Sequence, residues 1–141
     1  MTTADLQRFI DAQAPVWDDV LAELGAGAKR SHWMWFVFPQ LASLGRSATA
    51  RHYGLLDLAH AQAYAQHRVL GPRLRQCCAL LVALPGDVSA RQVFGDIDTL
   101  KLCSCLTLFE RADPGEALYA ALLQRWYGGR RDAQTLQRLG G

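Results

Sequence analysis

The spacing of apolar residues between two prolines constrains the fold of this chain more than any other feature of its sequence. Apolar side chains recur there every three or four residues: Leu74, Cys77, Cys78, Leu81, Val82 and Leu84, between Pro72 and Pro85. This spacing places them on one face of an α-helix, and proline is favoured in the first turn of a helix. The segment is therefore predicted to be a largely buried helix that begins near Pro72 and stops before Pro85-Gly86.

The rest of the chain repeats this helical spacing, interrupted by glycine and proline. Further helices are predicted over residues 5–14, 15–24, 48–53, 60–67, 89–95, 96–111, 116–127 and 132–139, with Thr3, Ser89 and Asp96 as N-caps. The first two helices are expected to form a tight hairpin. The aromatic segment SHWMWFVFPQ, residues 31–40, is expected to be a short helix or an irregular part of the core. Because no alternating strands, long linker or repeat is found, we predict an all-α, compact multihelical single domain over residues 1–141, with about 7–8 helices.

Composition and cysteine usage indicate a globular protein of the cytoplasm. Half of the 141 residues are hydrophobic and a fifth are charged, which suits one domain with one core. Cys77 and Cys78 are adjacent and Cys103 and Cys105 form a C-x-C, so neither pair has zinc-site spacing or suggests a disulfide framework. The N-terminus lacks the pattern of a signal peptide, and no apolar stretch approaches the roughly 20 residues that a membrane-spanning helix needs.

The charge pattern argues weakly for an anionic ligand and against a nucleic-acid stripe. Net charge is +2 and 13 of the 15 basic residues are arginine, interleaved with acidic residues until the C-terminal third. His52, His60 and His67 lack the spacing of a metal site, so no metal is predicted. No glycine loop for phosphates and no dinucleotide fingerprint occurs, and no cofactor is predicted.

The sharpest chemical signal is the pair Asp98 and Lys101. The two residues lie three apart on a predicted helix and share a face with Ser104. A lysine among Leu100, Leu102 and other apolar residues must pair with a carboxylate, extend to solvent or change its pKa, as functional lysines do. Asp98 and Lys101 are therefore the candidate catalytic residues, and Ser104 is a candidate ligand contact. The alternative is a structural ion pair that only fixes helix register.

Aromatic and polar residues around His32 supply candidate ligand contacts. Trp33 and Trp35 could clamp a planar group or a cation, with His32 and Gln40 at the edge of the pocket. The alternative is that the aromatic residues are simply part of the core, where such side chains dominate packing.

Two arginines are further candidates for contacts with an anion. Arg46 lies next to Ser47 in a glycine-containing loop, and Arg73 follows Gly71-Pro72 in the first turn of a predicted helix. Guanidinium groups at such positions can bind phosphate or carboxylate. The alternative for each is an ordinary solvated surface arginine.

Three blocks of sequence resemble a known bacterial family. They are SHWMWFVFPQLASLGRS, YGLLDLAHAQAYAQHRVLGPRL and FGDIDTLKLCSCLTLFERAD, and the closing WYGGRRDAQTLQRL extends the match to nearly the whole chain. The family is domain of unknown function 1810, and the resemblance implies a small multihelical fold. Some members are labelled calpastatin-like, but nothing in this chain supports protease inhibition. The family has a serine-rich stretch before TLF where this chain has Cys103, Ser104 and Cys105.

Two functions remain open at this point. The first is binding or processing of a small anionic or nucleotide-like ligand, in which Lys101 stabilises negative charge and Asp98 acts as a base or orients the lysine. The second is a non-enzymatic interaction or scaffold domain that binds an acidic protein or nucleic acid. Its candidate surface is the basic C-terminal part, with Arg125, Arg130, Arg131 and Arg138.

Overall fold

The chain folds as a bundle of short helices around one long helix. The structure is a computed structural model, and it describes residues 6–140. Its helices are α1 Gln7–Gln13, α2 Trp17–Ala26, α3 Met34–Val37, α4 Ala48–His52, α5 Leu58–Gln66, α6 Leu70–Val82, α7 Ala90–Ala112, α8 Leu118–Tyr127 and α9 Ala133–Arg138, with 3-10 turns η2 Ala14–Val16 and η3 Ala42–Leu44. The predicted all-α class is confirmed. The β-type pairing in the described residues is an isolated parallel bridge between Leu41 and Leu55.

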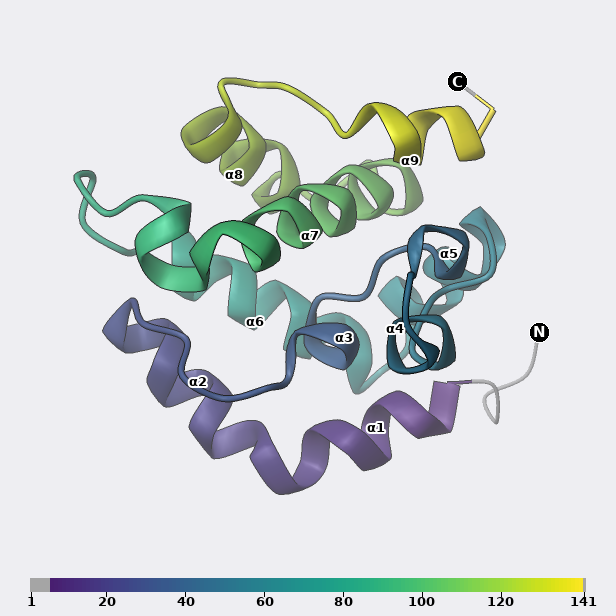
Figure 1. The fold of residues 1–141 in the computed structure, drawn as a ribbon, viewed down its shortest axis with the longest axis horizontal. Coiled ribbons are helices and arrows are strands. Elements are labelled where there is room, and N and C mark those ends of the chain that lie inside the picture. The colour runs from purple at the N-terminus through teal and green to yellow at the C-terminus, as the bar shows by residue number, and fades with distance from the viewer. Residues whose placement is uncertain (1–5, 141) are drawn as a thin grey trace.

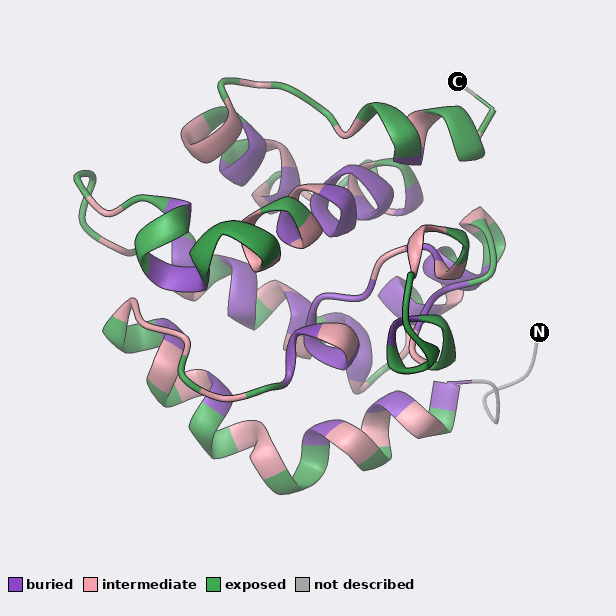
Figure 2. Cartoon of the chain, viewed as in Figure 1, coloured by how far each residue is buried: buried purple, intermediate pink, exposed green. Residues whose placement is uncertain are grey.

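Helix α7 is the centre of the packing. It lies against α5, α8 and α9, and α6 packs on α5 and α8 from the other side (Figure 1). The buried residues of these helices face one another, and exposed residues cover the outside (Figure 2). Phe109 on α7 shows how the layers meet, because its ring packs against Tyr64 of α5 and Tyr119 of α8. Burial of such apolar surface is the main force that holds helices together.

The expected hairpin of the first two helices is wrong. α1 packs against α3 and α2 packs against α6, and the two helices form a wide V along one edge of the molecule (Figure 1). The backbone between α1 and α2 explains this arrangement. Gln13 and Ala14 keep right-handed helical dihedrals, and Pro15 fits the first turn of η2. The chain therefore bends without reversing. The predicted N-cap at Thr3 lies outside the described residues.

The helix predicted between the two prolines is present and buried. α6 begins two residues before Pro72, so the proline lies within its first turn, and Leu74, Cys77 and Leu81 are in the core. Ser89 is the N-cap of α7, as predicted, and it also forms a capping box with Gln92. The aromatic segment 31–40 forms only the single helical turn α3, with irregular backbone on either side.

Helix α7 contains both helices that were predicted over 89–95 and 96–111, and they join at a kink. Gly95 there has φ 80° and ψ 175°, a backbone conformation that is essentially restricted to glycine. The carboxylate of Asp96, the expected second cap, instead pairs with Arg91 at 3.2 Å. Lys101 lies in the second part of α7, after this kink.

A pair of glycine substitutions separates backbone strain from crowding. No atom lies within 4 Å of a Cβ added at Gly95 or at Gly25, which lies in α2 without a positive φ. Gly95→Ala should therefore lower the free energy of unfolding by about 1–3 kcal/mol through strain alone. Gly25→Ala should raise it by about 0.5–1 kcal/mol, because alanine is the better helix former. Urea denaturation measures both values, and equal effects of the two substitutions would contradict this account.

Two tertiary contacts position the segments that surround α7. Backbone hydrogen bonds of 2.8–2.9 Å join residues 40–42 to Leu55, which fixes the chain between α3 and α4. On the other side, Thr107 of α7 accepts a hydrogen bond from the amide of Asp132 at 2.9 Å and so fixes the start of α9. These contacts bring residues distant in sequence to the same face of α7.

No helix in residues 6–140 is long and apolar enough to cross a membrane. All four cysteines are unpaired, and Cys77, Cys78 and Cys105 are fully buried. Within the described part of the chain, no three His, Cys, Asp or Glu side chains are grouped closely enough to hold a metal ion.

Candidate functional site

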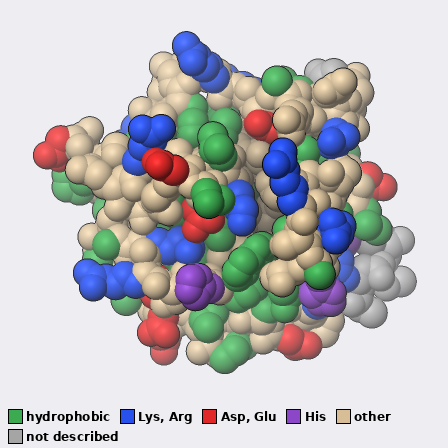
Figure 3. All heavy atoms as spheres, viewed as in Figure 1, with side chains coloured by type: hydrophobic (Ala, Val, Ile, Leu, Met, Phe, Trp, Pro, Cys, Tyr) green, Lys and Arg blue, Asp and Glu red, His purple; other side chains and the backbone are tan. Residues whose placement is uncertain are grey.

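The candidate site is a groove of about 610 Å³ along one face of α7. Its walls come from α7, from the chain between α3 and α4, and from the start of α9. Lys101 and Ser104 lie on the α7 side, and Gln40, Arg46 and Ser47 lie opposite. We call it the lysine groove. The face of the molecule in Figure 3 has a central hollow with Lys and Arg side chains around it.

Lys101 is partly exposed in this groove. Its side chain is 27 % exposed, and its Nζ lies 3.9 Å from Oδ1 of Asp98 and 5.4 Å from the centre of the Trp35 ring. A cation over an indole face is attracted by the electrons of the ring. The ammonium group of Lys101 thus lies against the Trp35 ring at the edge of the groove.

Asp98 has a closer partner than Lys101. Nζ of Lys29 lies 3.0 Å from Oδ2 of Asp98, and the Lys29 side chain is only 9 % exposed. Lys29 also lies 5.1 Å from the centre of the Trp33 ring. The single carboxylate therefore serves two ammonium groups, and its shorter contact goes to the more buried one. Asp98 lies beside the groove, and its carboxylate is the counter-ion of Lys29.

The hydrogen-bonding residues of the lysine groove are held in different ways. Ser104 is buried and its hydroxyl donates to the carbonyl of Leu100 at 3.3 Å, which leaves the oxygen lone pairs for another donor. Ser47 caps α4 by accepting from the amide of Ala50 at 3.1 Å. Arg46 is exposed at the rim, and Gln40 follows the buried Pro39. The groove thus combines two cations with hydroxyl and amide groups.

Trp35 lines a smaller pocket of about 10 Å³ next to the groove, together with Gln40. Gln40, Ala50 and Lys101 line both spaces, so the two are adjacent. Five predicted site residues are therefore brought together: Trp35, Gln40, Arg46, Lys101 and Ser104.

The other predicted residues lie elsewhere. Trp33 is fully buried in the core and its indole Nε1 donates to Glu23 at 3.0 Å, so it cannot touch a ligand in the groove. Arg73 stacks on Trp17 at 5.0 Å and donates to Gln13 at 3.3 Å, because α6 turns this side chain toward α2. His32 is exposed before α3 and does not line the groove.

The cysteines near the site are not arranged as nucleophiles. Burial raises the pKa of Cys103, and the nearby Asp132 carboxylate adds to this effect. Burial also raises the pKa of Cys105 well above its ordinary value. A thiol with a raised pKa is protonated at neutral pH and reacts slowly. The charged residues that line the groove are Arg46, Lys101 and Asp132.

The sequence analysis missed Lys29 and Asp132. Lys29 lies between α2 and α3, far from Asp98 in sequence, and only the fold brings them together. It is, however, the one lysine in the chain besides Lys101, and that rarity was a usable signal. Asp132 caps α9 through two hydrogen bonds from Thr135, at 2.9 Å and 2.6 Å, and its side chain lines the groove.

Comparison with known proteins identifies the family of this chain. No curated protein matches. Among solved structures, a conserved hypothetical protein from Mycobacterium tuberculosis is similar, with 51 % sequence identity, a TM-score of 0.94 and 97 % of each chain covered. The family model described as "Protein of unknown function (DUF1810)" matches residues 3–139, so the chain belongs to this family.

Proposed function

We propose that this protein binds a small anionic ligand in the lysine groove, with Lys101 as the main contact. One observation carries the proposal: Asp98 pairs with the buried Lys29 at 3.0 Å, whereas Lys101 lies 3.9 Å from it and faces the groove. One carboxylate cannot neutralise two ammonium groups. The positive charge of Lys101 is therefore left for a ligand anion, and Asp98 and Lys29 position it.

The other groups of the groove suit such a ligand. Arg46 at the rim adds a second cation, and its planar guanidinium can form two parallel bonds to phosphate or carboxylate. Ser104 and Gln40 can bond to hydroxyl or carbonyl groups of the same molecule. A volume of about 610 Å³ lies within the range of small-molecule sites. A cytoplasmic ligand is consistent with four unpaired cysteines.

A thermal-shift screen tests the proposal. Wild type, Lys101→Met and Lys101→Arg are heated with nucleotides, sugar phosphates and small carboxylates. A ligand at roughly 100 times its Kd stabilises by about 2.7 kcal/mol, which raises Tm by about 8 °C for a chain of this size. We expect one class to raise the Tm of wild type, with no rise for Lys101→Met and a partial rise for Lys101→Arg. Methionine keeps a long unbranched side chain but removes the charge that lies over the Trp35 ring.

Arg68→Ala is the matched control, because Arg68 is an exposed arginine outside the groove. Its response to the ligand should equal that of wild type. An equal response of Lys101→Met and wild type would show that the ligand does not use this lysine. If no compound acts and Lys101→Met only melts earlier, the lysine is a structural residue and the proposal fails.

The interaction-domain alternative has less support. Two of its four arginines already have partners, because Arg125 binds backbone carbonyls of α6 and its C-terminal extension, and Arg131 pairs with Glu110. Only Arg130 and Arg138 of that set remain as exposed cations without such a partner in the described residues. The basic C-terminal part thus supplies little charge for an acidic partner.

A further inference from the structure

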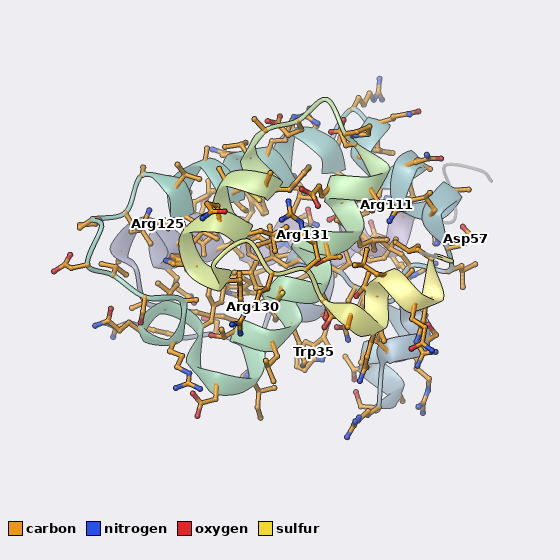
Figure 4. The ribbon with its side chains drawn as sticks, turned by 90° about the horizontal axis from the view of Figure 1, so that it is seen from above. Trp35, Asp57, Arg111, Arg125, Arg130 and Arg131 are labelled. Carbon is orange, nitrogen blue, oxygen red and sulfur yellow. The ribbon has the colours of Figure 1, made fainter. Side chains whose placement is uncertain are left out.

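A second groove, of about 450 Å³, lies beside the lysine groove. It is lined by Cys103 of α7, by Trp126 and Tyr127 at the end of α8, and by Arg130 on the segment that leads to α9. We call it the arginine groove. Figure 4 labels Arg130 on this segment, next to Arg131 and across from Arg125 on α8.

The two grooves meet at Leu100 and Asp132, which line both. Leu100 forms the ridge between the two grooves. Lys101 and Ser104 line the lysine groove on one side of Leu100, and Cys103 lines the arginine groove on the other side. Its side chain is 70 % exposed, and Ile97 one turn earlier is 71 % exposed. These are two of the four large apolar side chains that are exposed within residues 6–140. An exposed apolar ridge between two hollows is a place where a ligand would bury surface.

The arginine groove has a different chemistry from the lysine groove. The indole of Trp126 and the phenol of Tyr127 use their polar atoms inside the protein, donating to the carbonyls of Val88 at 3.1 Å and Thr99 at 2.6 Å. Both rings are thereby fixed, and the aromatic surface they offer to the groove is apolar. Arg130 is exposed, and its guanidinium has no partner among the described residues. Fixed aromatic walls and a free guanidinium suit a planar, polar ring.

The carboxylate of Asp132 favours a hydroxyl-bearing part of a ligand at the Leu100 ridge. Its Oδ2 accepts both hydrogen bonds from Thr135, which leaves Oδ1 for a donor in the groove. A carboxylate repels phosphate but accepts well from a sugar hydroxyl. The order along the surface is then a cation at Lys101, an acceptor at Asp132 and an aromatic hollow at Trp126.

We infer that the anionic ligand of the lysine groove is a nucleotide, with its phosphate at Lys101, its ribose at Asp132 and its base in the arginine groove. This inference rests on the proposed function and extends it to a ligand class and a second subsite. A sugar phosphate or a small carboxylate would fill only the lysine groove and leave the Leu100 ridge exposed. A nucleotide covers the ridge and meets the groups on both sides.

Calorimetric titration with a short and a long probe tests the inference. Ribose 5-phosphate carries the anion and the sugar, and AMP adds the base. We expect AMP to bind wild type at least about tenfold more tightly than ribose 5-phosphate, as one additional good contact would give. Lys101→Met should weaken both probes. Arg130→Ala should weaken AMP by about tenfold and leave ribose 5-phosphate unchanged.

A second variant fills the arginine groove without removing a charge. Ala133 is exposed at the start of α9 and lines this groove, so Ala133→Phe should fold and block the base. It should reduce the affinity for AMP to that for ribose 5-phosphate, and Arg68→Ala should change neither. Equal affinities of both probes for wild type, or an AMP advantage that survives in both groove variants, would overturn the base subsite. Ribose 5-phosphate binding that needs Lys101 would then still support the proposed function, whereas no binding of either probe would overturn both.

Discussion

Replacing Arg125 with alanine should lower the free energy of unfolding by about 3 kcal/mol. The guanidinium donates to four backbone carbonyls: to Leu81 and Val82 through Nη1 and to Leu84 and Pro85 through Nη2, at 2.5–3.1 Å. The last carbonyls of a helix have no partner inside the helix, and here α8 provides one for the end of α6. Without Arg125, these carbonyls lose their charged donor in a partly buried place, where a missing hydrogen bond is costly.

Urea denaturation measures this loss, with two further variants that identify its cause. Arg125→Lys keeps the charge but cannot span the four carbonyls with one ammonium group, and we expect it to recover less than half of the loss. Arg68→Ala removes an exposed arginine without these contacts and should change the free energy of unfolding by no more than about 0.5 kcal/mol. An effect of Arg125→Ala as small as that of Arg68→Ala would contradict the assigned role.

Local sequence signals predicted the helices because the interactions that form a helix join residues close in sequence. The periodic apolar residues of α6 are buried, and Ser89 caps α7, since both depend only on neighbours within one or two turns. The hairpin of α1 and α2 was wrong because Pro15, which was predicted to open the second helix, lies in η2 and continues the helical path without a reversal of the chain. Periodicity does not report the angle between consecutive helices.

The candidate site was predictable only in part, for the same reason. Lys101 was predictable as a candidate because it is a charged residue among apolar neighbours, but its environment depends on Lys29 and Trp35, which other segments bring to α7. Trp33 and Trp35 are two residues apart and were indistinguishable in the sequence. The single turn α3 sends Trp33 into the core and leaves Trp35 beside the groove.

The stability of this protein should fall in acid partly through one carboxylate, Glu23 of α2. It accepts hydrogen bonds from the amides of Arg30 and Ser31, from the Ser31 hydroxyl and from the Trp33 indole, at 2.6–3.0 Å. Burial raises the pKa of this carboxyl, but the four hydrogen bonds outweigh that effect and lower its pKa from 4.5 to about 2. The ionised form therefore holds the chain between α2 and α3, including the segment that carries Lys29.

The sign of the pH effect follows from the lowered pKa. The contribution of Glu23 is fully present above pH 4.5, the ordinary value, and is lost as the pH falls toward about 2. Glu23→Gln should lower the free energy of unfolding by about 2 kcal/mol at pH 7, because an amide nitrogen cannot accept the Ser31 hydroxyl. Between pH 4.5 and 2.5 the difference in free energy of unfolding between wild type and Glu23→Gln should shrink. Wild type then loses the ionised carboxylate, which the variant lacks at every pH.

Urea denaturation at pH 7, 4.5, 3.5 and 2.5 measures this convergence, and Asp19→Asn is the matched control. Asp19 is an exposed carboxylate on the same helix, so its substitution should leave a curve parallel to that of wild type. Other carboxylates also lose their ion pairs in acid, among them Glu110, whose pKa its hydrogen bonds with Arg131 lower. They act equally in wild type and variant, so the difference between the two curves isolates Glu23. A Glu23→Gln curve that stays parallel to wild type down to pH 2.5 would show that the four hydrogen bonds do not depend on the charge of Glu23.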